Sequence, residues 1–455
     1  VNFEASEPNM SPEGNAILVN RGKNEAIIED NEFRDCCTSN QLSYIVTFNG
    51  SKLNFCRNSF FFIEQNGCGC LRVYTTGNVV IEDNEFRGVN VELEDFYGVF
   101  IYEEMERTSS DYYTIIRNNI FDICQNDKQI SCFYFKWKSQ DYRFVNNTFK
   151  QCDFSNGIGK FDFMGCLNNG TFHFEKNRFL QNHGKSPFGG GSGIIFQNKG
   201  SEEFLYENHF TIVIDEGYFD SNSASNYESG NGGALQIGLD ESYSNIDLEI
   251  VNSSFINNQA YKEGGALFLM IQGNIEIFDC KFIGNFCRLS RDGKNYGGAI
   301  AIKPNCCSQQ SKNPDSITIN KCSFIGNYGP KTNSIYINNA QETEVIIGNQ
   351  CYFVENSTYS NSHYSIVTDS CNLKIDDCSF EFSSISLLSG EIESDHSFSI
   401  QNCVFCKSCS GSAIQLQQTN GLVKLFSLTN CEFENCVGSN ASCLSLNFIS
   451  NTDFV

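Results

Sequence analysis

The chain has 455 residues, with 31 basic and 54 acidic side chains and a formal net charge of −23. This balance argues against nucleic acid and anionic membranes as partners, because contacts to a phosphate backbone require an excess of Lys and Arg. No signal peptide and no apolar run long enough for a membrane-spanning helix is visible. The chain starts at Val1, and we interpret it as part of a longer or processed protein.

A repeat begins near the N-terminus. The heptapeptide IEDNEFR occurs at Ile28–Arg34 and again at Ile81–Arg87, with the related LNFCRNSF at Leu53–Phe60 between them. The shared frame, apolar-x-apolar-x-x-Asn/Cys-x-Phe, continues to the end of the chain. Its anchors are Phe33, Phe60, Phe86, Phe121, Phe149, Phe179, Phe219, Phe255, Phe282, Phe324, Phe353, Phe380, Phe405 and Phe433. Most spacings are 25 to 30 residues, and the four longer ones are interpreted as loop insertions. A period in this range indicates a solenoid.

The residue two positions before each anchor changes type along the chain. The first six are asparagines: Asn31, Asn58, Asn84, Asn119, Asn147 and Asn177. Gly217 and Ser253 follow, and the last six are cysteines: Cys280, Cys322, Cys351, Cys378, Cys403 and Cys431. Asparagine tolerates left-handed backbone at a corner, and its amide can bond to the next repeat, so we predict a structural ladder. For the cysteines we predict stacked buried thiols, with disulfides between repeats or metal binding by CVFCKSC as alternatives.

A second type of short strand precedes or follows each of these segments. It is clearest in GGALQI (Gly232–Ile237), GGALFL (Gly264–Leu269), GGAIAI (Gly297–Ile302) and GSAIQL (Gly411–Leu416). Both strand types are short and alternate apolar with polar residues, which favours strand over helix. We therefore predict an all-β fold, a right-handed single-stranded parallel β-helix of the pectate-lyase-like kind. It would have about 14 to 15 coils and form one domain over residues 1–455. A leucine-rich repeat is the alternative fold, but leucine is scarce and the repeat length varies.

The tetrapeptides GGA[ILV] and FxxN recur together. GGA occurs at 232–234, 264–266 and 297–299, and FxxN ends at Asn182, Asn222, Asn258, Asn285, Asn327 and Asn356. Between about residues 170 and 360 the pattern resembles the passenger domains of chlamydial polymorphic outer-membrane proteins and similar surface proteins of trichomonad parasites. The resemblance implies a right-handed parallel β-helix that serves surface adhesion or antigenic display. The membrane-inserting barrel of that family is not visible in this chain.

The acidic EDNE core is interpreted as architecture. The residue three before each anchor reads Asp30, Arg57 and Asp83 in successive repeats, which predicts a surface charge ladder worth about 0–1 kcal/mol per pair. Five sequons are candidate glycosylation sites: Asn146, Asn169, Asn252, Asn356 and Asn440. No catalytic, cofactor-binding or metal-binding residues are predicted, and no cofactor is expected.

The expected function is non-catalytic binding or antigenic display by a secreted or cell-surface protein, with a protein or glycan on another cell as partner. The 23 cysteines favour an extracellular location. Loop insertions on the rigid scaffold, such as Cys287–Asp315, are expected to carry the binding surface. A polysaccharide-acting lyase or hydrolase and a scaffold that self-associates end to end or laterally are the alternatives.

Overall fold

The computed structural model describes the chain as short parallel strands. The described residues are 2–4, 17–19, 25–36, 43–63, 68–89, 100–104, 113–126, 133–136, 142–154, 159–162, 170–184, 194–197, 210–225, 230–238, 246–271, 273–288, 296–303, 316–338, 343–355, 364–369, 371–389, 395–407, 412–418, 422–437 and 443–447. These residues contain no helix, and hence no helix that could cross a membrane. For this part of the chain the predicted all-β class is confirmed.

The chain divides into two compact units. Unit 1 comprises residues 1–230 and 234–238, and unit 2 comprises residues 231–233 and 239–455. Each unit is described by itself. The prediction of one domain over the whole chain stays a prediction.

Each anchor phenylalanine lies at the centre of a three-residue strand, here called a phenylalanine strand. In unit 1 these strands, with one earlier member, are β1 (Asn2–Glu4), β4 (Glu32–Arg34), β6 (Ser59–Phe61), β8 (Glu85–Arg87), β11 (Ile120–Asp122), β15 (Thr148–Lys150), β19 (Arg178–Leu180) and β23 (Tyr218–Asp220). In unit 2 they are β27 (Ser254–Ile256), β31 (Lys281–Ile283), β35 (Ser323–Ile325), β38 (Tyr352–Val354), β41 (Ser379–Glu381), β44 (Val404–Cys406) and β47 (Glu432–Glu434).

A preceding strand leads into each phenylalanine strand. In unit 1 these are β3 (Glu25–Glu29), the second halves of β5 (Ser43–Cys56) and β7 (Cys68–Glu82), β10 (Thr114–Arg117), β14 (Tyr142–Val145), β18 (Gly170–Glu175) and β22 (Phe210–Asp215). In unit 2 they are β26 (Ile246–Val251), β30 (Ile275–Phe278), β34 (Ser316–Asn320), β37 (Glu344–Gly348), β40 (Asn372–Asp376), β43 (Asp395–Gln401) and β46 (Leu422–Thr429).

A following strand comes later in the repeat, sometimes after a two-residue short strand. In unit 1 the following strands are β2 (Ile17–Val19), the first halves of β5 and β7, β9 (Phe100–Glu104), β13 (Phe133–Lys136), β17 (Gly159–Asp162), β21 (Ile194–Gln197) and β25 (Leu235–Ile237). In unit 2 they are β29 (Leu267–Leu269), β33 (Ile300–Ile302), β36 (Thr332–Asn338), β39 (Tyr364–Asp369), β42 (Ile385–Ser389), β45 (Ile414–Gln418) and β48 (Leu444–Asn447). The short strands are β12 (Gln125–Asn126), β16 (Asp153–Phe154), β20 (His183–Gly184) and β24 (Ser223–Ala224) in unit 1, and β28 (Gln259–Ala260) and β32 (Phe286–Cys287) in unit 2.

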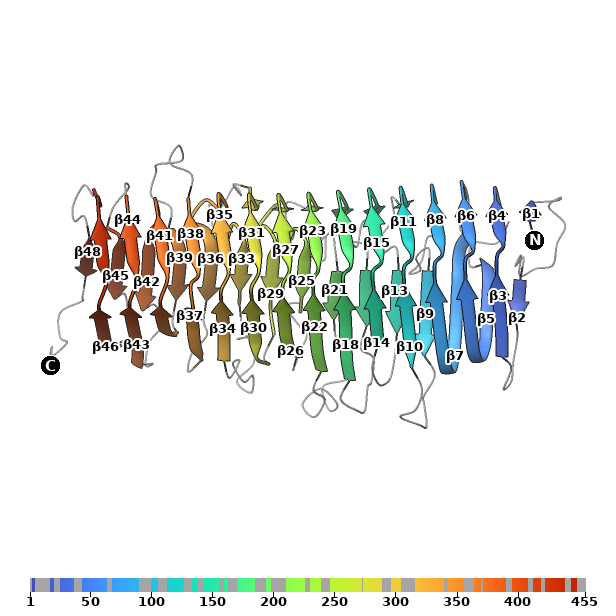
Figure 1. Ribbon diagram of the computed structural model, residues 1–455, viewed down its shortest axis with the longest axis horizontal. Helices are drawn as coiled ribbons and strands as arrows, with labels where there is room; N and C mark the ends of the chain where they lie inside the picture. The colour runs from blue at the N-terminus through green and yellow to red at the C-terminus, as the bar shows by residue number, and fades with distance from the viewer. Residues whose placement is uncertain are drawn as a thin grey trace. The chain divides into compact units, whose positions relative to one another are not determined.

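Equivalent strands of successive repeats pair in parallel within each unit (Figure 1). The phenylalanines stay in register, so their rings form a stack. The ring centroids of Phe33 and Phe60 in unit 1 lie 4.6 Å apart, and those of Phe282 and Phe324 in unit 2 lie 4.9 Å apart. These spacings match the distance between neighbouring strands of a sheet. The spacing of the anchors along the sequence therefore sets the register of the sheet.

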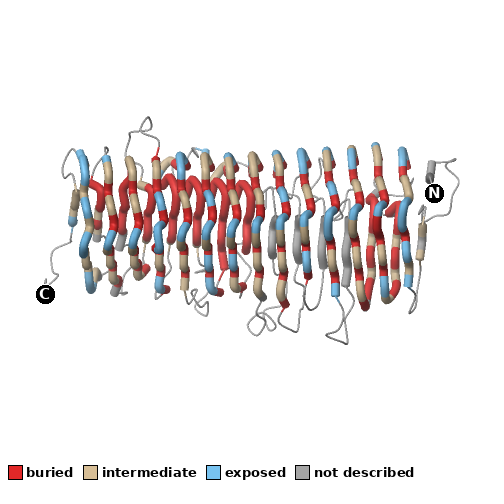
Figure 2. Tube along the Cα trace, viewed as in Figure 1, coloured by how far each residue is buried: buried red, intermediate tan, exposed pale blue. Residues whose placement is uncertain are grey.

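Buried and exposed positions alternate along most strands (Figure 2). In β18, for example, Phe172 and Phe174 are buried, whereas the residues between and after them are partly exposed. This alternation places one face of each sheet in an apolar core and leaves the other toward solvent. It follows directly from the apolar-x-apolar pattern of the sequence.

Two columns of left-handed residues flank the phenylalanine strands. One lies three residues before each anchor and includes Asp30, Arg57 and Asn118, with φ between 55° and 57°. The other lies two residues after the anchor and includes Phe62 and Ile123. The left-handed corner was expected at the ladder asparagine, and this expectation is wrong by one residue. The asparagine side chain must point into the core, so the residue before it makes the corner.

The glycine pair of the GGA motif has two separate functions. The first glycine adopts positive φ, as at Gly264 (φ +62°) and Gly297 (φ +69°). The second packs against backbone, since a Cβ atom on Gly265 would overlap the carbonyl oxygen of Gly298. Only glycine meets both requirements without strain.

Candidate functional site

The six asparagines two positions before the anchors form a continuous hydrogen-bonded ladder in unit 1. The Nδ2 atom of each donates to the Oδ1 atom of the next, over 2.9 Å from Asn31 to Asn58 and 3.0 Å from Asn147 to Asn177. The same Oδ1 atom also accepts from a backbone N–H, as Asn84 Oδ1 does from Asn58. From Asn58 onward each Nδ2 atom also donates to a main-chain carbonyl of the previous repeat. The ladder satisfies polar groups that would otherwise be buried without partners.

The six cysteines occupy the same position in unit 2 and are thiols. The thiol of Cys322 donates to the carbonyl of Ile277 over 3.6 Å, and that of Cys351 donates to Ile319 over 3.4 Å. These carbonyls lie five residues before the previous anchor, as do the carbonyls that accept from the asparagines. Burial raises the pKa of the Cys322 thiol. The thiol thus replaces the amide at the same acceptor as a weak donor on a small apolar side chain.

A second ladder lies three residues after the anchors, and the sequence reasoning did not identify it. In unit 1, Asn182 Nδ2 donates to Asn222 Oδ1 over 2.9 Å. In unit 2, Asn258 donates to Asn285 and Asn285 to Asn327, over 3.0 and 3.1 Å. The FxxN tetrapeptide is the sequence pattern of this ladder.

We call the ladder position two residues before the anchor the first corner and the ladder position three residues after it the second corner. The side-chain types at these two positions swap along the chain. Where the first position holds asparagine, the second holds cysteine or an aliphatic residue, and where the first holds cysteine, the second holds asparagine, serine or, in the last repeat, cysteine. The repeat around Phe179 is the one with asparagine at both, Asn177 and Asn182. Cys124 and Cys152 at the second position donate to carbonyls over 3.6 Å, as the later asparagines do. Most repeats therefore contribute one amide to the ladders.

Two candidate glycosylation sites can be placed. Asn146 and Asn252 lie in the first left-handed column, and both are exposed. Asn146 Nδ2 donates to Asn118 over 3.0 Å. Asn169, Asn356 and Asn440 lie outside the described residues.

The repeated EDNE segments form surface contacts. Arg57 makes a two-pronged contact with Asp30 over 2.7 and 2.9 Å, and it also reaches Glu29 over 2.8 Å. The hydrogen bond from Arg57 holds the pKa of Asp30 below its usual range. Asp83 instead accepts from Asn118. All of these side chains are substantially exposed, so the contacts add little stability.

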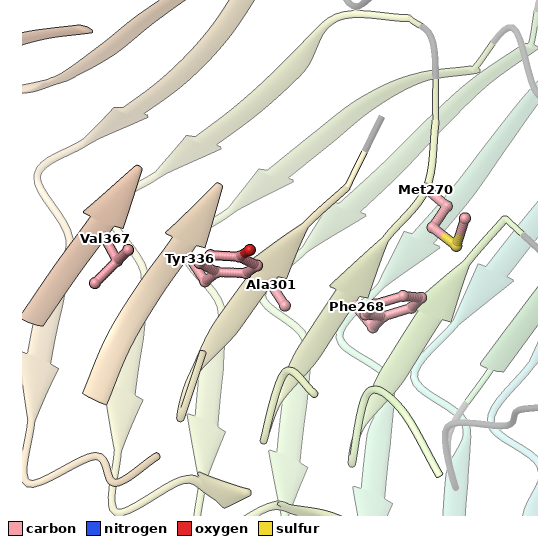
Figure 3. Packing of buried hydrophobic residues seen from close by; sticks show 5 residues of the cluster. All are labelled: Phe268, Met270, Ala301, Tyr336 and Val367. Atoms are coloured by element: carbon pink, nitrogen blue, oxygen red, sulfur yellow. The ribbon is translucent and has the colours of Figure 1, made fainter. Parts of the chain in front are cut away.

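An apolar row covers one face of the following strands in unit 2. Phe268, Ala301, Tyr336 and Val367 project from successive strands on the same side, with Met270 beside them (Figure 3). Strand alternation puts them on the face opposite to the fully buried aliphatic residues at neighbouring positions of β29, β33 and β36. Ile366 is likewise buried beside Val367 on β39, so the four strands β29, β33, β36 and β39 have both faces buried.

Polar and aromatic side chains border this row. The rings of Tyr296 and Tyr336 stack with centroids 4.0 Å apart. Lys331 Nζ donates to the Tyr296 hydroxyl over 3.0 Å and lies over its ring, and Lys303 lies near the Tyr336 ring. Lys303 also pairs with the buried Glu263 carboxylate over 2.5 Å. We call Glu263, Tyr296, Lys303, Lys331 and Tyr336 the lateral cluster.

The lateral cluster reaches the protein surface. Lys331 is exposed, Tyr296 is half-buried, and the Lys303 side chain is 27% exposed. Burial raises the pKa of the Tyr336 hydroxyl, and the nearby Tyr296, Asp369 and Glu263 add to the effect. The arrangement offers aromatic surface, ammonium donors and a tyrosine hydroxyl within one small region. Tyr296 and Lys303 both come from the Cys287–Asp315 insertion, which was expected to carry function.

A buried carboxyl group contacts the starts of β36 and β39, two of the strands that carry the apolar row. Glu355 follows β38 and is 6% exposed. Its Oε1 atom accepts from Ser334 over 3.1 Å and from Ser365, whose hydroxyl also bonds to that of Ser383 over 2.5 Å. Among the described residues, its Oε2 atom has no hydrogen-bond partner. Burial raises the pKa of Glu355 to about 7, with the hydrogen bonds from Ser365, Ser334 and Asn333 opposing the effect.

No group of three or more His, Cys, Asp or Glu side chains is arranged to hold a metal ion within the ranges that the structure describes. Compared with known proteins, the chain matches no family model, no curated sequence and no solved structure.

Proposed function

We propose that the chain is a right-handed parallel β-helix of about 14 to 15 coils that belongs to a secreted or cell-surface protein. It binds a protein or glycan on another cell through the lateral cluster and catalyses no reaction. The parallel, in-register ladders support the fold, since each repeat stacks on its neighbours with equivalent residues in columns. The resemblance to adhesin-like surface repeats supports the role.

The lateral cluster is the observation that carries the binding proposal. Tyrosine contributes a rigid aromatic surface with a polar tip, and such residues dominate the energetics of recognition sites. Lys331 and Lys303 can donate to carboxylate or hydroxyl oxygens of a ligand, and Glu263 holds Lys303 in place. The cluster is therefore suited to a partner with hydroxyl or acidic groups.

Binding of the purified chain to intact animal cells tests this function. We expect saturable binding that falls about tenfold or more in a Tyr296→Ala/Lys331→Ala double variant. Lys150→Ala removes an exposed lysine of β15 in unit 1 and serves as the matched control. Equal binding by both variants would show that the lateral cluster is not the site.

A depolymerisation assay on acidic polysaccharides, run on the same sample, tests the rival enzyme function. Cleavage of the polymer without cell binding would replace the proposal with a polysaccharide-acting enzyme. A series of salt concentrations separates the contributions to binding. Loss of binding at high salt indicates that exposed charges such as Lys331 dominate, and salt-independent binding indicates the tyrosines.

A further inference from the structure

Glu355 occupies an unusual place in its repeat. It lies two residues after the anchor Phe353, where the described repeats on either side have left-handed residues such as Gly326 and Phe382. Glu355 is not left-handed, and its side chain is buried rather than exposed. A carboxyl group is rarely found buried without a charged partner. Its position therefore requires a physical explanation.

The groups that face this carboxyl are all neutral. They are the hydroxyls of Ser334 on β36, Ser365 on β39 and Ser383 after β41, with the amide of Asn333 nearby. Within the described part of the chain, no charged side chain acts on Glu355. Both serine bonds go to Oε1, and Oε2 is buried with no hydrogen bond to any residue that the structure describes. An ionised Glu355 would leave a buried negative charge only half solvated by hydrogen bonds.

Glu355 is hydrogen-bonded to serines on β36 and β39, two of the strands that carry the apolar row. Ser334 lies two residues before Tyr336 on β36, and Ser365 lies two residues before Val367 on β39. The N–H of Ser365 also donates to Ser384 over 2.8 Å. The Glu355 carboxyl thus joins the starts of two neighbouring strands, of which β36 carries Tyr336 of the lateral cluster and β39 carries Val367 of the apolar row.

We propose that Glu355 is a proton-dependent latch that holds β36 and β39 together, so that binding through the lateral cluster is stronger in mildly acidic than in alkaline solution. The pH dependence of binding rests on the proposed function, whereas the latch itself is a property of the unliganded protein. When Glu355 loses its proton, the charge can reach water only if the starts of the strands separate.

The direction of the effect follows from the pKa of the group. The folded-state pKa of about 7 lies above the ordinary value of 4.5, so the folded state holds the proton more tightly. The stabilisation is complete below pH 4.5 and is lost as the pH rises through about 7. The local opening equilibrium should therefore increase about tenfold between roughly pH 6 and pH 8.5.

Hydrogen exchange on the unliganded protein tests the latch. Protection factors, which are already corrected for intrinsic exchange rates, are compared at the two pH values for the amides of Ser365 and Tyr336. We expect the tenfold loss of protection in the wild type and no loss in Glu355→Gln. Glu381→Gln is the matched control, because Glu381 is a partly exposed carboxylate paired with Lys407 and its pKa is below the ordinary value. Protection that is independent of pH in the wild type would overturn the latch.

An infrared measurement on the wild type covers the case in which Glu355→Gln does not fold. At pH 7 carboxyl groups with ordinary pKa values are almost completely ionised, whereas Glu355 is about half protonated, so the carbonyl band of a protonated carboxylic acid reports Glu355. The band should vanish by pH 8.5, and its absence at pH 7 would refute the latch. Cell binding at pH 6 and pH 8.5 then tests regulation. Equal binding at both values would remove the regulatory role, and no binding at either, with the exchange result intact, would refute the proposed function alone.

Discussion

Substitution of one ladder asparagine tests whether amide and thiol are interchangeable at the first corner. The Asn119 side chain is fully buried and takes part in five hydrogen bonds. In Asn119→Ala, the N–H and the amide of Asn84 lose an acceptor, and the carbonyl of Ile81 loses a donor. Each buried polar group that is left unpaired costs about 1–3 kcal/mol. We therefore expect a loss of about 3–5 kcal/mol in local stability.

Asn119→Cys should be much less damaging. A thiol can donate to the carbonyl of Ile81, as Cys322 donates to Ile277 over 3.6 Å. Its sulfur can also accept a backbone N–H, as Cys351 does from Cys322 over 3.4 Å. The weaker bonds leave an expected loss of about 1–2 kcal/mol.

The assay is native-state hydrogen exchange of the Asn84 amide and its neighbours, because repeat arrays open locally and a single unfolding transition averages over many repeats. A Lys150→Ala variant gives the baseline. If the cysteine variant lost as much protection as the alanine variant, the two columns would not be equivalent, and the exchange of side chains between corners would need another explanation.

Three further outcomes are expected. Glu355→Gln should remove the pH dependence of thermal stability between pH 4.5 and 8.5, because a pKa rise from 4.5 to about 7 corresponds to about 3 kcal/mol of stability that the wild type loses as the pH increases. Calorimetry of the variant that still showed the pH dependence of the wild type would contradict this. In the native protein Cys322 should not react with a maleimide, whereas the partly exposed Cys406 should, as measured by peptide mass spectrometry with guanidinium-unfolded protein as the control. Rapid labelling of Cys322 would mean that the cysteine column is accessible to solvent. Gly265→Ala should prevent folding or destabilise unit 2 by more than about 2 kcal/mol, whereas Gly326→Ala should cost about 1 kcal/mol because its φ is positive and no atom lies near the added carbon. Circular dichroism melts compare the two variants, and equal losses of stability would refute the steric argument.

The architecture could be predicted from the sequence because its main determinant is periodic. An anchor phenylalanine every 25 to 30 residues indicates which residues stack, and the alternating pattern around it indicates which face is buried. The first ladder follows from the same columns. The position of the left-handed residue does not, because many residue types occupy that column, including Arg57 and Ile123. Their conformation is imposed by the strand pairing on both sides and not by local preference.

The lateral cluster and the Glu355 network could not be predicted in the same way. Tyr296 and Tyr336 are in different repeats and belong to no shared motif, so only the paired strands and the insertion bring their rings together. Glu355 falls at a frame position that is exposed or partly exposed in the other described repeats, and nothing in its neighbours along the chain indicates burial. Serine is common throughout this sequence, so Ser334, Ser365 and Ser383 do not stand out in it. Sites made from one residue per repeat become visible only when the register is known.

The exchange of asparagine and cysteine between the two corners restricts how such a chain can lengthen by gene duplication. A repeat copied next to its parent meets neighbours with the same side chains at both corners, so every amide keeps its partner. A repeat with asparagine at the first corner, inserted between Cys280 and Cys322, would bury an amide between two thiols and interrupt the bond from Asn285 to Asn327 in the second ladder. Tandem copying is therefore tolerated and distant transposition is not. The identical segments Ile28–Arg34 and Ile81–Arg87 both lie in the part of the chain where their asparagines match.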